Sequence, residues 1–479
     1  MRSARPLFLA VPGLALFLLT LWGLRLQQRG EVPWFIAIAL AQGAVYFVAV
    51  FWVSRRPSPL WLVLAFAALL RLPLLFSPPI LSTDLYRYVW DGRVQAAGIS
   101  PYRFVPAAPE LKALRDGSIY PYINRKEYAV TIYPPAAQLF FLATTRIAES
   151  VTWMKASILA CEGLAIWLLV LLLRMAGRPG AEVLLYAWHP LALWEFAGSG
   201  HLDAAAIALV LGALLARARG RGALTGVLLG LAALVKIYPL ALFPALWRRR
   251  DFMLRPAGSA RRRQSRLLDF ILRPAGSARR RQSRLLRFAM PAALAATMAL
   301  GYLPYLGVGP RVLGFLPDYL AEEGLQSGAR YYLLRLAGTL ASAQLHPALY
   351  LVPAGLLLAA LSAWVWLRQP EGSGAGGALL LASAATLLLS PHYAWYLAWL
   401  LPLAALTKCT PVLLLGATSF VLYVSALVDN AETAQWAGNL LYLPFAVACI
   451  VWAAQTRALA GTTSPALAIG NHVESNPAD

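Results

Sequence analysis

The chain has 479 residues, of which 59% are hydrophobic and only 13% are charged, and its formal net charge is +21. Soluble globular proteins carry roughly a quarter charged residues, so this composition excludes an ordinary soluble domain. The positive charge is concentrated in segment 248–287, where fourteen arginines against two aspartates give +12. This segment follows an apolar stretch and has few aromatic residues for base stacking, so we expect membrane lipids and no nucleic acid as partners.

Apolar stretches that approach or exceed the length of a membrane-spanning helix recur along the chain. In chain order they are Pro6–Leu24, Trp34–Val53, Leu60–Phe76, Trp153–Leu173, Ala289–Leu306, Ala348–Leu367, Leu379–Leu389, Ala394–Leu406, Val412–Val428 and Leu440–Ala454. Leu, Ala and Val dominate without the alternation of barrel strands, which predicts an all-α polytopic membrane protein. We interpret the first stretch as a spanning helix and not as a cleaved signal peptide.

Basic residues set the expected orientation, because cytoplasmic loops are enriched in Lys and Arg. Arg2 and Arg5 place the N-terminus in the cytoplasm, and the long polar segment 77–150 then lies outside. Within it, Tyr133–Ala148 begins with two prolines and ends in charges, so we expect an interfacial helix that does not span. This choice places the later arginine clusters inside and gives about 12–14 transmembrane helices.

The predicted organisation has six parts. They are three transmembrane helices over 1–76, an outer loop with interfacial helices over 77–150, transmembrane helices of a catalytic module over 151–247, a cytoplasmic Arg-rich loop over 248–287, C-terminal transmembrane helices over 288–456 and a cytoplasmic tail over 457–479. The Arg-rich loop contains two nearly identical copies of an 18-residue unit. We interpret it as a duplication in a tolerant loop or as an amphipathic surface helix on anionic lipid, since solenoids need more copies.

Cysteines and metal-ligand patterns give little sign of a cofactor. Cys161, Cys409 and Cys449 lie in apolar stretches without paired spacing, which predicts packing residues. No His, Cys or acidic cluster has the spacing of a metal site, and no Gly-rich phosphate loop follows a strand. We therefore expect neither a metal nor another cofactor.

Unusual polar residues gather on the predicted outer side, where ionisable groups next to hydrocarbon are functional candidates. The candidates are Asp84, Arg87, Asp91, Tyr133, His201, Asp203, Lys236 and His392. Asp84 is either a general base or an acid that suits a helix N-terminus, and Arg87 either binds phosphate or pairs with Asp84. Asp91 is the weaker candidate, because it could instead fix the turn at Gly92 or pair with Arg93.

The remaining candidates also have simpler interpretations. His201 and Asp203 lie at a predicted helix start, where an interfacial ring and an N-terminal acid would be ordinary. Lys236 either places its charge on a phosphate or extends its ammonium to the interface. His392 follows Ser390-Pro and either belongs to the site or only breaks a helix pair. His189, in Trp188-His189-Pro190, is equally explained as a core histidine.

Several short motifs, taken in order, resemble the polytopic GT-C glycosyltransferases, especially the bacterial glycosyltransferase family 87 and its mannosyltransferase relatives. The motifs are Asp84-Leu-Tyr-Arg-Tyr-Val-Trp-Asp-Gly-Arg, Gly98-Ile-Ser-Pro-Tyr, Ile132-Tyr-Pro-Pro, Gly200-His-Leu-Asp, Lys236-Ile-Tyr-Pro-Leu and Ser390-Pro-His-Tyr. The resemblance implies an inverting transfer from a polyprenyl-phosphate sugar donor to a hydroxyl of a glycan or lipid acceptor, in a bacterial inner membrane with both termini cytoplasmic. It implies catalysis by Asp84 and lipid-phosphate contact by Lys236.

Two other functions compete with this one. A lipid-sugar transporter or flippase would be expected to show inverted repeats and broken midplane helices, which we do not find. A membrane polysaccharide ligase or polymerase would share the outer-face chemistry but would use a pyrophosphate donor.

Overall fold

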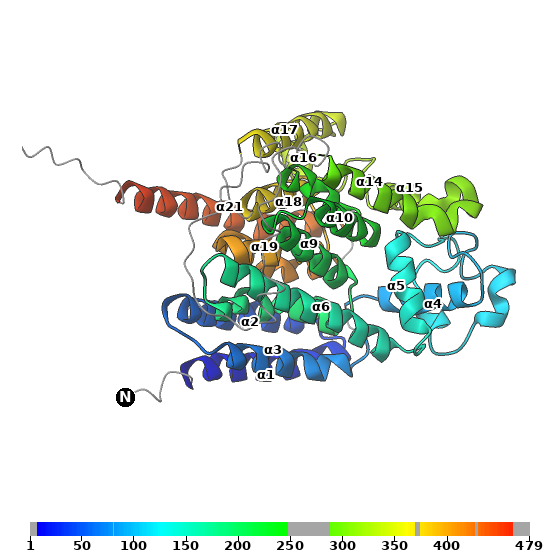
Figure 1. Cartoon of the computed structure of the whole chain (residues 1–479), viewed down its shortest axis with the longest axis horizontal. Coiled ribbons are helices and arrows are strands. Elements are labelled where there is room, and N and C mark those ends of the chain that lie inside the picture. The colour runs from blue at the N-terminus through cyan, green and yellow to red at the C-terminus, as the bar shows by residue number, and fades with distance from the viewer. Residues whose placement is uncertain (1–6, 80, 248–287, 369–373, 427–429, 463–479) are drawn as a thin grey trace, which may run out of the picture.

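The computed structural model describes residues 7–79, 81–247, 288–368, 374–426 and 430–462. Within these ranges every regular element is a helix, as the composition predicts. The duplicated Arg-rich unit and the last part of the predicted tail lie outside the described residues. Figure 1 shows a helical bundle with a smaller region, which carries α4 and α5, at one end.

The N-terminal bundle is built from long apolar helices that pass back and forth. They are α1 (Leu7–Gln28), α2 (Val32–Arg55), α3 (Leu60–Leu75) and α6 (Val151–Met175). Residues 76–150 leave the bundle at the end of α3 and return at the start of α6. They form α4 (Asp84–Ala96), two short turns of 3-10 helix at Pro109–Leu114 and Tyr120–Tyr122, and α5 (Pro135–Thr145).

Six helices in the described ranges are long and apolar enough to cross a membrane, and five shorter apolar helices accompany them. The protein is therefore a polytopic membrane protein. Helix α5 has 11 residues, about 16 Å, which is too short to cross a hydrocarbon core of about 30 Å. The prediction of 12–14 crossings stays a prediction, as does the orientation in the bilayer.

The middle of the chain is broken into short helices. They are α7 (Leu184–Ala187), α8 (Pro190–Ala192), the π-helical turn η4 (Leu193–Gly198), α9 (Asp203–Ala218), α10 (Gly222–Val235), η5 (Tyr238–Leu242) and α11 (Phe243–Leu246). His189 lies at the break between α7 and α8, fully buried, and its Nε2 is 3.0 Å from the Leu413 carbonyl oxygen. His189 is thus a satisfied core histidine.

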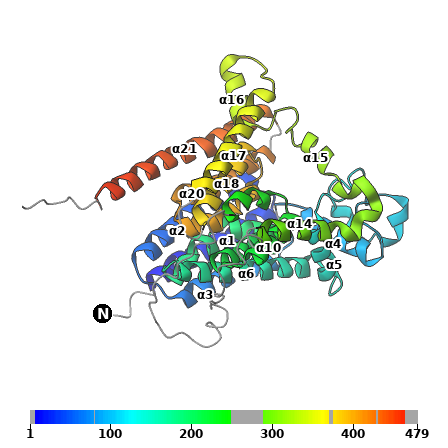
Figure 2. The same cartoon turned by 45° about the horizontal axis from the view of Figure 1, so that its top comes forward.

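The C-terminal half packs on this core. Its elements are α14 (Ala289–Tyr302), η6 (Leu303–Leu313), α15 (Leu316–Glu322), α16 (Tyr332–Ala341), α17 (Ala348–Arg368), α18 (Ala375–Leu388), η7 (Ala394–Leu397), α19 (Leu400–Thr407), α20 (Thr410–Thr418), η8 (Ser419–Ala426) and α21 (Ala431–Thr462). Both views place α15 close to the α4–α5 region, and α21 ends on the side where α1 begins (Figures 1 and 2).

The loop between α4 and α5 is held by charged contacts. The Arg93 guanidinium donates to Asp116 at 2.8 Å and to Glu149 at 2.7 Å. Burial alone would raise the pKa of Asp116, but Arg93 and two backbone N–H groups hold that pKa well below its usual range. The alternative in which Asp91 pairs with Arg93 is therefore wrong, because Asp116 and Glu149 already occupy this guanidinium.

Candidate active site

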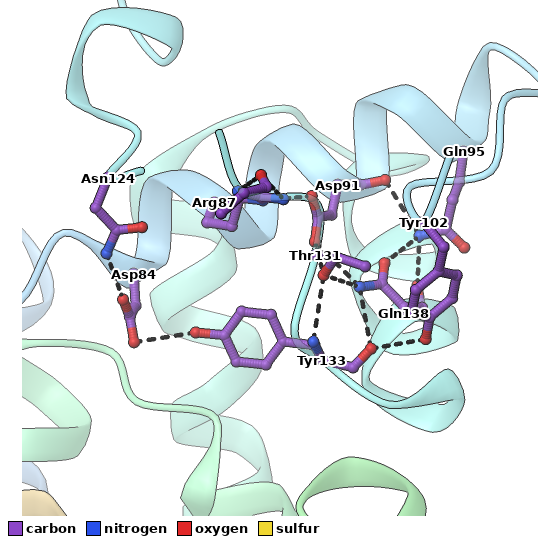
Figure 3. A network of polar contacts seen from close by, with 10 residues as sticks. Asp84, Arg87, Asp91, Gln95, Tyr102, Asn124, Thr131, Tyr133 and Gln138 are labelled. Carbon is purple, nitrogen blue, oxygen red and sulfur yellow. Dashed lines mark hydrogen bonds and ion pairs between the residues drawn. The ribbon is translucent and has the colours of Figure 1, made fainter. Parts of the chain in front are cut away.

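Asp84 begins α4 at the edge of the bundle. Its backbone N–H donates to the Ser82 hydroxyl at 3.2 Å. The half-buried carboxylate accepts one hydrogen bond from the Tyr133 hydroxyl at 3.0 Å and one from the Asn124 amide at 2.8 Å (Figure 3). Asp84 is thus oriented by two neutral donors, and none of the described cations forms an ion pair with it.

Arg87 and Asp91 form a separate buried network on the same helix. Arg87 Nε donates to Asp91 at 2.8 Å, and both of its Nη atoms donate to the Ala129 carbonyl at 3.2 Å. Asp91 also accepts from Thr131 at 2.5 Å and from Gln138 at 3.0 Å (Figure 3). The alternative in which Arg87 pairs with Asp84 is therefore wrong, because Arg87 pairs with Asp91, one helical turn further along α4.

Tyr133 links α4 to the start of α5. Its ring is buried and packs edge-on against Tyr88, with 5.0 Å between ring centroids. Burial, and then the nearby Asp84 carboxylate, raise the pKa of Tyr133 well above its ordinary value. The phenol therefore stays protonated and acts as a fixed hydrogen-bond donor to Asp84.

The Gly200-His-Leu-Asp motif docks directly on α4. Gly200 has φ +74°, and a Cβ there would lie 2.8 Å from a Leu85 methyl carbon, so glycine suits both the backbone and the space. His201 is fully buried and stacks on Trp395 with centroids 4.5 Å apart. Its Nε2 is 3.4 Å from a Glu195 carboxylate oxygen. Asp203 is the first residue of α9, as expected.

Lys236 lies between Asp203 and Tyr133. The residue is extended and ends α10, and its Nζ is 3.5 Å from Asp203 Oδ2 and 5.5 Å from the Tyr133 ring centroid. Tyr238 donates to the other Asp203 oxygen at 2.9 Å. Burial disfavours the ammonium ion, but Asp203 and the other neighbouring groups outweigh it, so the pKa of Lys236 is raised. The ammonium is therefore charged and lies next to the group that orients Asp84.

His392 is set apart from this cluster. Its Nε2 is 3.0 Å from Glu323, which also accepts from Arg330 at 2.6 Å. Tyr319 and Tyr396, whose hydroxyls are 2.5 Å apart, connect this group with the neighbourhood of Lys236. The structure thus brings Asp84, Tyr133, His201, Asp203 and Lys236 together. It places His392 at the rim and Arg87 with Asp91 behind Asp84.

Sequence reasoning missed several residues of the site. Asn124 lies in an irregular loop with no periodic signal, and Glu323 and Tyr396 come from the C-terminal half. Tyr238 stands inside the quoted Lys236-Ile-Tyr-Pro motif, but nothing in the sequence indicates that its hydroxyl reaches Asp203. Within the described ranges, no group of three or more His, Cys, Asp or Glu side chains could hold a metal ion.

An apolar groove runs from this cluster along α9, between α5, α6 and α10. It is a cavity of about 490 Å³. One end, at Ala136, Ala205 and Val235, adjoins Tyr133, Asp203 and Lys236 in the sequence. The other end contains Arg219 and Arg221. Because α9 has 16 residues, the groove follows about 24 Å of helix.

A family model described as alpha-(1->6)-mannopyranosyltransferase, N-terminal domain, matches residues 17–248. The match covers slightly less than half of the chain and includes every predicted site residue except His392. Together with the membrane-spanning helices, it makes the chain a membrane glycosyltransferase. Residues 17–248 are thus similar to this mannosyltransferase family, which confirms the predicted resemblance to mannosyltransferases. No curated protein and no solved structure gave a significant match.

Proposed function

We propose that the protein transfers a mannosyl residue from a polyprenyl-phosphate donor to a glycan hydroxyl at the outer face of the membrane, with inversion at the anomeric carbon. One observation carries the proposal. The Asp84 carboxylate and the Lys236 ammonium lie on either side of Tyr133, with the hydroxyl of Tyr133 on Asp84 and its ring 5.5 Å from Lys236. A base and a cation thus both contact the same tyrosine.

The Asp84 carboxylate acts as the general base. It accepts the proton of the acceptor hydroxyl while that oxygen forms a bond to the anomeric carbon. The bond between this carbon and the donor phosphate oxygen breaks, and its electron pair leaves with the lipid phosphate. A single displacement of this kind inverts the anomeric centre. Tyr133 and Asn124 fix the carboxylate, so little reorganisation is needed at the moment of reaction.

The Lys236 ammonium stabilises the leaving phosphate, whose negative charge develops in the transition state. Arg87 is the less suitable cation, because its donors are used by Asp91 and Ala129. The apolar groove begins beside Val235 and Ala205, so the first part of the donor's lipid tail leaves the site along α9. A charged head on Lys236 and an apolar path next to it fit a lipid-linked donor.

Replacing Asp84 tests the proposal. Asp84→Asn keeps the size of the side chain but removes the base, so we expect transfer to fall about 100- to 10,000-fold. The measurement is transfer by the purified protein from a synthetic polyprenyl-phosphate mannose to a mannoside acceptor. Asp318→Asn is the matched control, since Asp318 is exposed in α15. An Asp84→Asn protein with wild-type transfer would contradict the assignment, and translocation of the donor without transfer would favour the flippase.

A further inference from the structure

Arg219 and Arg221 lie at the far end of the apolar groove. Arg219 follows α9 and Arg221 precedes α10, and Gly220 between them has φ +70°, which reverses the chain at the groove mouth. Arg219 Nε and one Nη are buried and have no hydrogen-bond partner among the described residues. Neither arginine forms a salt bridge with any residue that the structure describes. Buried guanidinium donors of this kind call for an acceptor.

The electrostatic surroundings point the same way. Burial, and then the charge of Arg221, lower the pKa of Arg219 from its usual value. An anion bridging the two guanidinium groups would relieve both effects, and Arg binds phosphate through paired N–H donors. Arg217, near the same turn, donates to the Leu246 carbonyl at 3.1 Å, immediately before the Arg-rich segment begins.

The groove beside these arginines is apolar and open to its surroundings. Leu215, Ala216 and Leu228 line the part nearest to them. At the rim, Leu224 is 41% exposed and Trp167 is 48% exposed. A ligand that places an anion on the arginines therefore continues into hydrocarbon, as a lipid does and free phosphate does not. This turn lies on the predicted cytoplasmic side of the membrane, where the leaflet is rich in anionic lipid.

We propose that this end of the groove binds one anionic phospholipid, with its phosphate on Arg219 and Arg221 and an acyl chain along α9 and α10. The site is about 24 Å of helix away from Asp203, and so from the reacting groups. The proposal does not depend on the reaction assigned to Asp84. The proposal adds a second lipid, at the end of the groove opposite to the phosphate of the sugar donor.

Lipid binding tests the proposal directly. The purified full-length protein is delipidated, mixed with phosphatidylglycerol or phosphatidylcholine, and analysed by native mass spectrometry. We expect one phosphatidylglycerol to remain after the other lipids dissociate, and none of the phosphatidylcholine. In the double variant Arg219→Gln, Arg221→Gln, the affinity for phosphatidylglycerol should fall about thirtyfold, since two cations that contact the phosphate are lost.

The matched control removes two arginines elsewhere. Arg55 and Arg56 are exposed at the end of α2, on the same predicted side, so Arg55→Gln, Arg56→Gln should retain the bound lipid. Equal losses from both double variants would mean a general surface attraction and would overturn the site. Displacement of the lipid by a polyprenyl-phosphate analogue would also overturn it, because the groove would then hold the donor alone. Asp84→Asn should lose transfer and keep the phospholipid, which separates this proposal from the proposed function.

Discussion

At the scale of single residues, the hydrogen-bond partners of each cation decide whether it can bind a phosphate. Arg87 and Lys236 are both cations of the predicted site, but Arg87 is 5% exposed and each of its three nitrogens donates to Asp91 or Ala129. Lys236 has a side chain that is 17% exposed and only a loose contact with Asp203, at 3.5 Å. An incoming phosphate can therefore share the Lys236 ammonium without breaking a buried pair.

Lys236→Gln removes this charge and keeps a side chain of similar reach. We expect kcat/KM for the lipid-phosphate donor to fall about 100- to 1000-fold, as for the loss of one donor to transition-state charge. Steady-state transfer assays with a synthetic donor measure it. Lys112→Gln, at an exposed position of the loop between α4 and α5, is the control and should be unchanged. A Lys236→Gln enzyme with an unaltered kcat/KM would show that another group holds the phosphate.

At the scale of elements, close backbone packing positions α4. A Cβ at Gly92 would lie 2.5 Å from the Phe141 carbonyl oxygen, so α4 and α5 meet closely at this point. On another side of α4, Gly200 lets the Gly200-His-Leu-Asp loop contact Leu85. These two contacts hold Asp84 in register with Tyr133 on one side and with His201 and Asp203 on the other.

Gly200→Ala tests the second contact. The positive φ makes an L-residue unfavourable by about 1–2 kcal/mol, and the new methyl group must also displace Leu85. Gly98→Ala is a close control, because Gly98 has φ +76° but nothing within 4 Å of its hypothetical Cβ. We expect Gly200→Ala to lower both thermal stability in detergent and transfer, and Gly98→Ala to show only the conformational effect. Equal behaviour of the two variants would mean that docking of the loop on α4 is unimportant.

At the scale of the whole molecule, contacts between distant segments complete both the bundle and the site. Arg71 in α3 and Glu162 in α6 form a buried bidentate pair, with Nε to Oε2 at 2.7 Å, although the whole outer loop separates them in sequence. Trp395 packs on His201, and Tyr396 lies near Lys236. Both residues come from the half of the chain that the family match does not reach. The N-terminal family domain therefore does not form the observed site alone.

Glu162→Gln breaks the buried pair and leaves the Arg71 charge without its counter-ion. We expect a loss of about 3–5 kcal/mol in stability, since removal of one partner strands the other charge. The measurement is thermal unfolding in detergent. The double variant Arg71→Met, Glu162→Leu should regain much of this loss, because no unpaired charge remains. A double variant that is less stable than Glu162→Gln would contradict this explanation.

The sequence by itself determined that the protein is an all-helical membrane protein and gave the order of its motifs. It also identified Asp84, His201, Asp203 and Lys236 as polar residues in unusual surroundings. Hydropathy, helix length and motif order are local properties of the chain, so they can be read without a structure. Only the tertiary structure decided the pairing of Arg87 with Asp91, the support of Asp84 by Tyr133 and Asn124, and the groove along α9. Such partners are chosen by burial and packing between distant segments, which local sequence patterns do not encode.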